Sequence, residues 1–252
     1  MKKKVLCIIA AVVFCLAVPV GALANSAEPP CVTVLVLAPP GDLELTIEFD
    51  SAQDRDPQRL SPEWMLWEGY YRFFGRWDAD PEGLTGARLL VGTEGESFAL
   101  EIDPAGFSKY NNILTLDLKT RTLTYGQPWW RQPLLVFVRV ALTLLIEGGI
   151  FWLFRYRQKR SWIVFLVANL ITQLGVNLTL LAVCPTALDS YMAMVTGFFV
   201  YTPMEVLVLL MEMIAFAKLL REHSKRRAAG AAFLANLLSW ALGGLLLLIL
   251  PI

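Results

Sequence analysis

Residues 133–154 read PLLVFVRVALTLLIEGGIFWLF and run directly into the basic turn RYRQKR at residues 155–160. An α-helix needs about 20 mostly apolar residues to cross the hydrocarbon core of a bilayer, and the first string meets that length. Three further segments of the same kind follow, at residues 162–183, 191–219 and 228–252. Because 56% of the chain is hydrophobic, its composition is that of a membrane protein. We therefore predict that residues 132–252 form a membrane α-helical bundle of four transmembrane helices.

The charges between these segments predict how the helices cross the membrane. The loops at residues 155–161 and 220–227 hold most of the lysine and arginine of this half, whereas residues 184–190 hold neither. Positively charged loops stay on the cytoplasmic side of the plasma membrane. We therefore expect both basic loops to be cytoplasmic and both ends of the mature chain to lie outside.

Aromatic and basic residues near the segment ends predict where the membrane surfaces lie. Trp129, Trp130 and Arg131 precede the first segment, so we expect them at the outer surface. Arg139 lies a few residues inside the outer edge, and we expect its side chain to snorkel outward.

Residues 1–24 have the pattern of a secretory signal peptide. Three lysines at positions 2–4 precede an apolar stretch, and Ala22-Leu23-Ala24 supplies a cleavage site of small residues. The alternative is a first helix that is retained. Residues 25–131 then form an exported domain with 17 acidic and 9 basic side chains, a balance that argues against a nucleic-acid partner.

Two cysteines remain once a cleaved signal removes Cys7 and Cys15. Cys31 opens the exported domain, and Cys184 opens the loop between the second and third segments. The predicted topology places both outside the cytoplasm, where a disulfide can persist. The pair is therefore either a bridge or two unpaired thiols.

The exported domain has the residue alternation of a β-rich fold. Apolar and polar residues alternate over residues 43–49, as in a half-buried strand. Further strand-like runs lie at residues 32–37, 87–92, 97–102 and 114–125, the last being a hairpin. Ser61-Pro62-Glu63 has the pattern of a helix start, so we predict one helix carrying the aromatic residues of 64–77. We expect that helix to pack under the sheet; an exposed ligand surface is the alternative.

Each apolar segment carries one polar side chain at a similar distance from its basic end. These residues are Glu147, Asn169, Glu212 and Asn236. Each lies six to nine residues from its flanking Arg or Lys, which is about 9 to 14 Å along a helix. Hydrocarbon penalises such groups unless they face one another or water. We therefore predict a buried polar layer shared by the four helices.

A second polar tier is predicted farther from the cytoplasmic surface. On the second segment, one stripe is formed by Asn169, Thr172, Gln173 and Asn177. On the third segment, Glu205 shares a face with Glu212, and it lies level with Gln173 at roughly 20 Å from the inner surface.

The three carboxyls, Glu147, Glu205 and Glu212, have no basic residue at their depth in the sequence. Burial without a counter-ion favours the neutral acid, which donates a hydrogen bond to an amide or hydroxyl oxygen. The layer has two interpretations. Either its hydrogen bonds hold the helices together, or it is a site for a proton, a cation or a polar solute.

Several stretches of the membrane half carry a family resemblance. They are Leu144-Leu145-Ile146-Glu147, residues 169–177, residues 205–212 and Ala235-Asn236-Leu237-Leu238-Ser239. In these stretches the chain resembles a group of uncharacterised membrane proteins from clostridia-like Gram-positive bacteria. The resemblance covers nearly the whole chain and is strongest in the spans. It implies a signal peptide, an exported β-rich domain and four transmembrane helices, without an established activity.

No catalytic pattern is present in the sequence. The single histidine, His223, falls in a predicted cytoplasmic loop, and no phosphate-binding glycine-rich loop occurs. We therefore expect no cofactor, no metal and no enzymatic activity. The expected partners are the lipid bilayer and other membrane or envelope proteins. The first hypothesis is a non-enzymatic envelope protein with an exported ligand- or partner-binding domain; the alternative is a proton- or cation-coupled transporter that uses the carboxyls.

Overall fold

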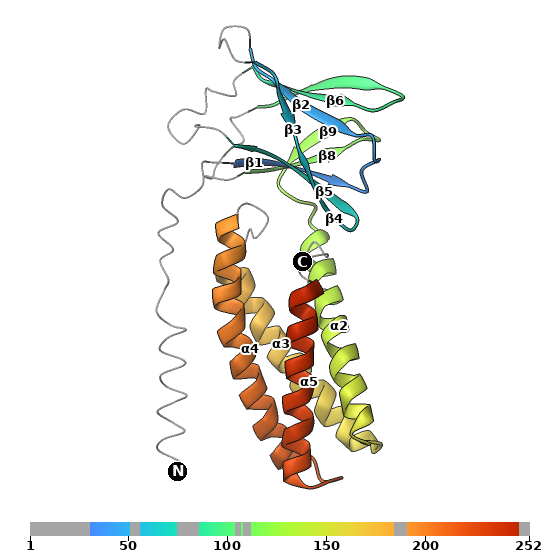
Figure 1. Ribbon diagram of the computed structural model, residues 1–252, viewed down its shortest axis with the longest axis vertical. Coiled ribbons are helices and arrows are strands. Elements are labelled where there is room, and N and C mark those ends of the chain that lie inside the picture. Colours follow the sequence, from blue (N-terminus) through green and yellow to red (C-terminus); the bar gives the residue numbers. More distant parts are fainter. Residues whose placement is uncertain are drawn as a thin grey trace.

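The computed structural model describes residues 31–50, 56–74, 86–103, 107, 112–183 and 191–246. Within these residues, a β-rich domain stands at one end of the molecule and four long helices stand at the other (Figure 1). The predicted signal at residues 1–24 and the loop at residues 184–190 lie outside the described residues.

The first of two sheets has five strands. Their order is β4 (Pro62–Met65), β5 (Glu68–Phe74), β1 (Cys31–Leu37), β8 (Asn112–Asp117) and β9 (Thr122–Tyr125). β1 pairs with β8 in parallel and with β5 in antiparallel orientation. β1 is the central strand and six of its seven residues are buried, which explains its nearly continuous apolar sequence.

The second sheet has four antiparallel strands. Their order is β3 (Gln58–Leu60), β2 (Glu44–Glu48), β6 (Arg88–Gly92) and β7 (Ser97–Glu101). The strands expected from alternation near residues 43–49, 87–92, 97–102 and 114–125 are confirmed.

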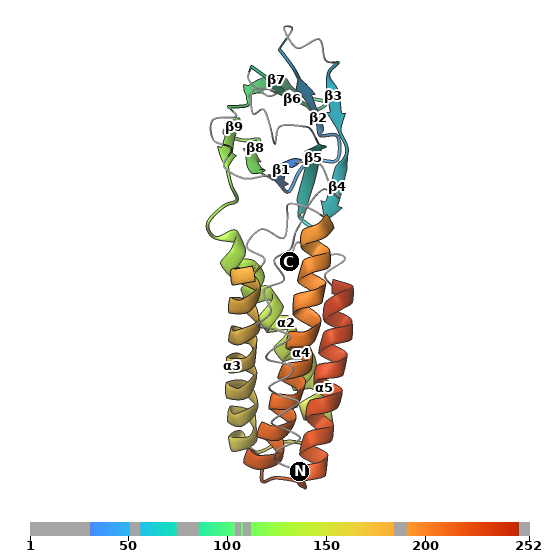
Figure 2. The same cartoon turned by 90° about the vertical axis from the view of Figure 1, so that its left-hand side faces the viewer.

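The two sheets pack face to face around one apolar core (Figure 2). Val34 and Val36 of β1 belong to this core together with Leu45 of β2 and Leu89 of β6. Side chains alternate between the two faces of a strand, so these residues all point into the space between the sheets. Tyr71 lies in the same core, and burial raises its pKa to about 12.

The helix predicted for the aromatic segment is wrong. Residues 62–74 form β4 and β5, joined by a turn in which Leu66 has a φ of 47°. Aromatic residues favour strands, and both faces of β5 are buried, so its apolar residues do not show the usual alternation. Pro62 opens β4, which is an edge strand of the sheet, and there its missing N–H costs no ladder hydrogen bond.

Four helices follow the sandwich in the described chain. They are α2 (Arg131–Leu153), α3 (Lys159–Val183), α4 (Tyr191–Leu219) and α5 (Lys225–Leu246). Three stretches are long and apolar enough to cross a membrane, namely Arg131–Leu153, Lys159–Leu180 and Val200–Leu219. α5 packs against both α2 and α4, and α3 packs against α4. The described residues therefore have the form of a multi-pass membrane protein, with α5 as a fourth helix in the bundle.

An aromatic cluster holds the helices together beside the basic turns. The Phe151 ring stacks on Tyr156 with centroids 4.2 Å apart and on Phe165 at 4.9 Å. Phe216 of α4 lies 5.8 Å from Phe151, so α2, α3 and α4 meet at one ring.

The two basic turns are also tied to each other by hydrogen bonds. The Glu222 carboxylate accepts from the backbone N–H groups of Arg157 at 2.7 Å and Gln158 at 3.2 Å. Desolvation acts to raise the pKa of Glu222, but these hydrogen bonds outweigh it and hold the pKa below its usual value. Arg227 donates to the carbonyl of Phe154 at 2.7 Å. Both turns therefore form one structural unit on one side of the bundle.

Leu89→Ala is expected to lower the free energy of unfolding by about 2 to 5 kcal/mol, because it opens a cavity between the sheets. Urea denaturation of the purified protein in detergent, followed by near-UV circular dichroism, measures the loss. Leu90→Ala is the matched control, since Leu90 is the next residue on the outer face of β6 and is only half-buried. Equal losses at both positions would contradict the assignment of the core.

Candidate functional site

A buried ion pair joins the sandwich to the first long helix. Arg131 is the first residue of α2, and Glu68 is the first residue of β5. The guanidinium donates from Nε to Glu68 Oε1 at 2.9 Å and from Nη2 to Oε2 at 2.7 Å. The exposed fractions of the two side chains are 2% and 0%. The contact is thus a bidentate pair shielded from water, the strongest geometry available to arginine and carboxylate.

Neighbouring side chains complete this junction. Tyr70 donates its hydroxyl hydrogen to Glu68, and Arg131 Nη2 lies 3.0 Å from the same hydroxyl oxygen. Arg131 Nη1 donates to Gln127 Oε1 at 2.8 Å. Burial, followed by the Glu68 hydrogen bond, raises the pKa of Tyr70, so its hydroxyl remains a donor over the physiological range.

The junction corrects the expected role of Arg131. Trp129 is 87% exposed, as expected of a residue that meets the membrane surface, but Arg131 turns inward and is 1% exposed. The sequence contains no local signal for the pair, because Glu68 and Arg131 are 63 residues apart.

A second candidate site lies inside the bundle. The Glu212 carboxylate of α4 accepts two hydrogen bonds, from the Thr172 hydroxyl of α3 and from the Asn236 amide of α5, each at 2.7 Å. The Glu147 carboxyl of α2 accepts from the Ser239 hydroxyl of α5 at 2.7 Å. Each of the four helices therefore contributes at least one side chain, and these residues are 1–8% exposed.

The contacts of both carboxyls meet on the last helix, at two residues one turn apart. Ser239 Oγ lies 3.1 Å from the backbone carbonyl of Asn236, so the Glu147 contact and the Glu212 contact share the last helix. Asn169 is fully buried, and its amide donates to the carbonyl of Phe165 at 3.0 Å. We refer to Glu147, Asn169, Thr172, Glu212, Asn236 and Ser239 as the lower layer.

The second tier contains a cation that the sequence interpretation placed elsewhere. Arg139 does not extend outward; its Nη1 donates to Asn177 Oδ1 at 3.2 Å, and it interacts electrostatically with Glu205 and Tyr201. The expectation that Glu205 has no basic residue at its depth is therefore wrong. The guanidinium finds carboxyl and amide oxygens inside the bundle, and these contacts stabilise it there although the outer surface is only a few residues away. Gln173, expected level with Glu205, is also buried, at 3% exposed.

Sequence reasoning missed three members of these two tiers. Ser239 lies three residues after Asn236, so helical spacing places both on one face and was sufficient to find it. Tyr201 lies one turn before Glu205 and hydrogen-bonds to it. The inward position of Arg139 depends on its side-chain rotamer, which residue spacing does not predict.

The two alternatives for Cys31 and Cys184, a bridge or two unpaired thiols, both stay open. Cys31 is 1% exposed at the start of β1, and its Sγ lies 3.6 Å from the Thr33 hydroxyl oxygen. Cys184 lies outside the described residues.

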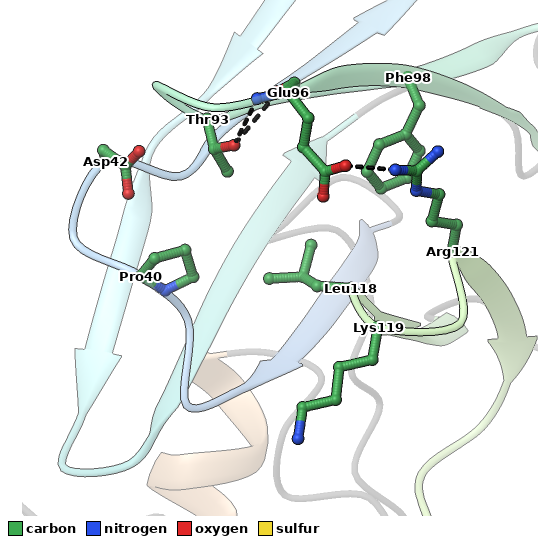
Figure 3. Close-up of a pocket in the computed structure, with 8 residues that line it drawn as sticks. All are labelled: Pro40, Asp42, Thr93, Glu96, Phe98, Leu118, Lys119 and Arg121. Carbon is green, nitrogen blue, oxygen red and sulfur yellow. Dashed lines mark hydrogen bonds and ion pairs between the residues drawn. The ribbon is translucent and has the colours of Figure 1, made fainter.

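The sandwich has an open hollow of about 430 Å³ beside the turns that join its strands (Figure 3). It is lined by Pro40, Asp42, Thr93, Glu96, Phe98, Leu118, Lys119 and Arg121. Arg121 pairs with Glu96 and lies over the Phe98 ring, 5.3 Å from its centroid. The hollow thus combines an apolar floor with charges of both signs, a combination suited to a polar partner and lacking a nucleophile with a base.

Among the described residues, no group of three or more His, Cys, Asp or Glu side chains is arranged to hold a metal ion. A scan against protein-family models found no match to this chain, and a search of curated proteins found none either. The function therefore has to be argued from the residues themselves.

Glu68→Gln is expected to lower the free energy of unfolding by about 3 to 5 kcal/mol, because it leaves the Arg131 guanidinium buried without a counter-charge. Thermal or urea unfolding of the full chain in detergent measures this loss. Glu44→Gln is the matched control, since Glu44 pairs with Arg59 on the surface, where such pairs contribute about 1 kcal/mol or less. A loss of stability at Glu68 no larger than the loss at Glu44 would show that the buried pair stabilises the fold no more than a surface pair does.

Proposed function

We propose that this chain is a multi-pass plasma-membrane protein, without enzymatic activity, that presents a ligand- or partner-binding β-sandwich outside the cell. Four helices hold the sandwich at the membrane, and the loops at residues 155–161 and 220–227 face the cytoplasm. The observation that carries the proposal is the buried Glu68–Arg131 pair. It fixes the sandwich to the first residue of a membrane-length helix, so the sandwich is held at the end of the bundle.

The distribution of charge supports this orientation. The basic turns lie at the end of the bundle opposite the sandwich, as Figure 1 shows. Positive loops remain inside, so the sandwich belongs outside.

The exposed aromatic residues near the junction support a position at the membrane surface. Trp64 and Leu66 of the β4–β5 hairpin are 48% and 63% exposed, and Trp129 is 87% exposed. Leu66 is two residues from Glu68, which binds the first residue of α2. The hairpin turn therefore lies near the outer end of that helix, where tryptophan and apolar residues favour the lipid interface.

The hollow in Figure 3 is the place for a ligand or partner in this proposal. Lys119 and Arg121 follow the β8 strand in a turn, and Asp42 lies across from them in the β1–β2 connection. Turn residues on a rigid sandwich are a common location for recognition. A partner with both acidic and basic groups fits this lining.

Cysteine accessibility in whole cells tests the orientation. Thr120 and Gln158 are exposed, one in the sandwich and one in the first basic turn. In a variant with the native cysteines replaced by serine, Thr120→Cys is expected to react with a membrane-impermeant maleimide in intact cells. Gln158→Cys is expected to react only after permeabilisation. Labelling of both from the same side would refute the topology.

A second candidate function is proton- or cation-coupled transport, and the lower layer favours it. Glu147 accepts from Ser239 and Glu212 accepts from Asn236, and these two donors lie one turn apart on α5, so polar groups of three helices gather there. Buried ionisable groups in membrane segments are costly and commonly mark ion pathways. Packing alone needs fewer of them.

Liposome flux tests this second candidate. Liposomes containing the wild-type protein are expected to dissipate an imposed proton or sodium gradient faster than empty liposomes. Glu147→Gln is expected to return the rate to the empty-liposome leak, because it removes the charge and keeps the side-chain shape. Glu101→Gln, on an exposed strand position of the sandwich, is the control and should leave the rate unchanged. Equal rates for Glu147→Gln and the wild type would remove the transport candidate.

A further inference from the structure

The lower layer has more hydrogen-bond acceptors than donors. Thr172 and Ser239 each give their hydroxyl hydrogen to a carboxyl oxygen, and the Asn236 amide is occupied by Glu212 and the carbonyl of Ala232. No further hydrogen atom of these described side chains is left to donate to the two carboxyls.

Three oxygen atoms of the layer are buried without a hydrogen-bond partner among the described residues. They are Glu147 Oε2, Asn169 Oδ1 and Asn236 Oδ1. The side chains that carry them are 1%, 0% and 4% exposed, respectively. A buried polar atom without a partner costs about 1 to 3 kcal/mol, so three in one layer are a substantial penalty unless a hydrogen-bond donor or a cation reaches them.

The charges around the layer point to the same shortage. Its two carboxyls are on α2 and α4, which also carry Arg139 and Glu205 one tier away and Lys218 in the last turn of α4, six residues from Glu212. Arg139 is engaged one tier away with Asn177 and interacts with Glu205. Within their described spans, α3 from residue 162 and α5 from residue 228 add no charged side chain. The lower layer therefore contains acids and amide oxygens without a cationic side chain of its own.

We propose that the lower layer binds one small monovalent cation, a proton or Na⁺, at Glu147 Oε2 with the amide oxygens of Asn169 and Asn236 as supporting acceptors. A proton on Glu147 Oε2 makes that atom a donor for an amide oxygen, and Na⁺ takes carboxyl and amide oxygens as ligands. This cation is the transported ion of the second candidate function, on which the proposal rests, and its binding is measurable without flux. A bound cation without flux would leave the site in place and remove only the transporter.

The test is the thermal stability of the full-length protein in detergent, followed by tryptophan fluorescence. A ligand that binds only the folded state raises the melting temperature with its concentration. Sodium chloride is compared with choline chloride at equal ionic strength, and each is measured in mildly acidic and mildly alkaline buffer. The wild type is expected to be stabilised by Na⁺ if the ligand is sodium, or by acidic buffer alone if the ligand is a proton.

Two variants assign the response to the layer. Glu147→Gln is expected to abolish it, and Asn169→Ala is expected to weaken the apparent affinity by roughly tenfold, the lower end of what supporting residues contribute in ion sites. Asn169→Ala keeps both carboxyls and therefore remains informative if Glu147→Gln does not fold. Glu101→Gln is the control, because Glu101 lies on an exposed strand position of the sandwich, away from the layer, and it should retain the response.

Three results would overturn the proposal. The first is a wild type that responds neither to Na⁺ nor to acidic buffer. The second is a response that Glu147→Gln retains in full. The third, decisive where Glu147→Gln does not fold, is an Asn169→Ala response equal to that of the wild type.

Discussion

The contact on which the rest of the structure depends is the pair between Glu68 and Arg131, because it places two full charges where water does not reach them. Removing either charge from water costs several kcal/mol, and only a bidentate geometry with further hydrogen bonds offsets that cost. Tyr70 and Gln127 supply those bonds. The pair therefore has one good arrangement, and this ties the first residue of β5 to the first residue of α2. A sandwich joined by residues 126–130 alone would be free to rotate on the bundle.

The opposite end of the bundle is fixed by a different kind of contact. Phe151 meets rings from α3, α4 and the first basic turn, and Glu222 joins the two turns through backbone N–H groups. Both ends of α2 are thus held, one by charge and one by aromatic packing. The lower layer lies between them, so its polar groups are shielded from both surfaces. Hydrogen bonds position such a layer more precisely than apolar contacts alone, since each hydrogen bond has a preferred distance and direction.

Much of this arrangement was predictable from the residues. Alternation predicted most strands, and the length of the apolar segments predicted the membrane-length helices. Equal spacing from the basic ends predicted that Glu147, Asn169, Glu212 and Asn236 lie at one depth, and all four are buried. The aromatic segment was misassigned because both faces of β5 are covered, which removes the period of two, and because Pro62 is equally acceptable at a helix start and on an edge strand. Glu68 with Arg131, and Arg139 with Asn177, were not predictable, since long-range pairing depends on side-chain directions that spacing does not give. The family resemblance and the fourth span remain predictions.

The two buried polar sites follow one physical rule with opposite outcomes. At the junction, the negative charge of Glu68 meets a fixed positive charge, and the site is closed. In the lower layer, the described partners of the two carboxyls are hydroxyl and amide groups alone, and three acceptor atoms have no donor among the described residues. A closed site contributes to structure alone, because nothing is gained by adding a ligand. A site short of positive charge is stabilised by whatever small cation reaches it, so its stability depends on the solution around the protein. The same desolvation cost thus makes Glu68 a structural residue and Glu147 a residue whose state can change.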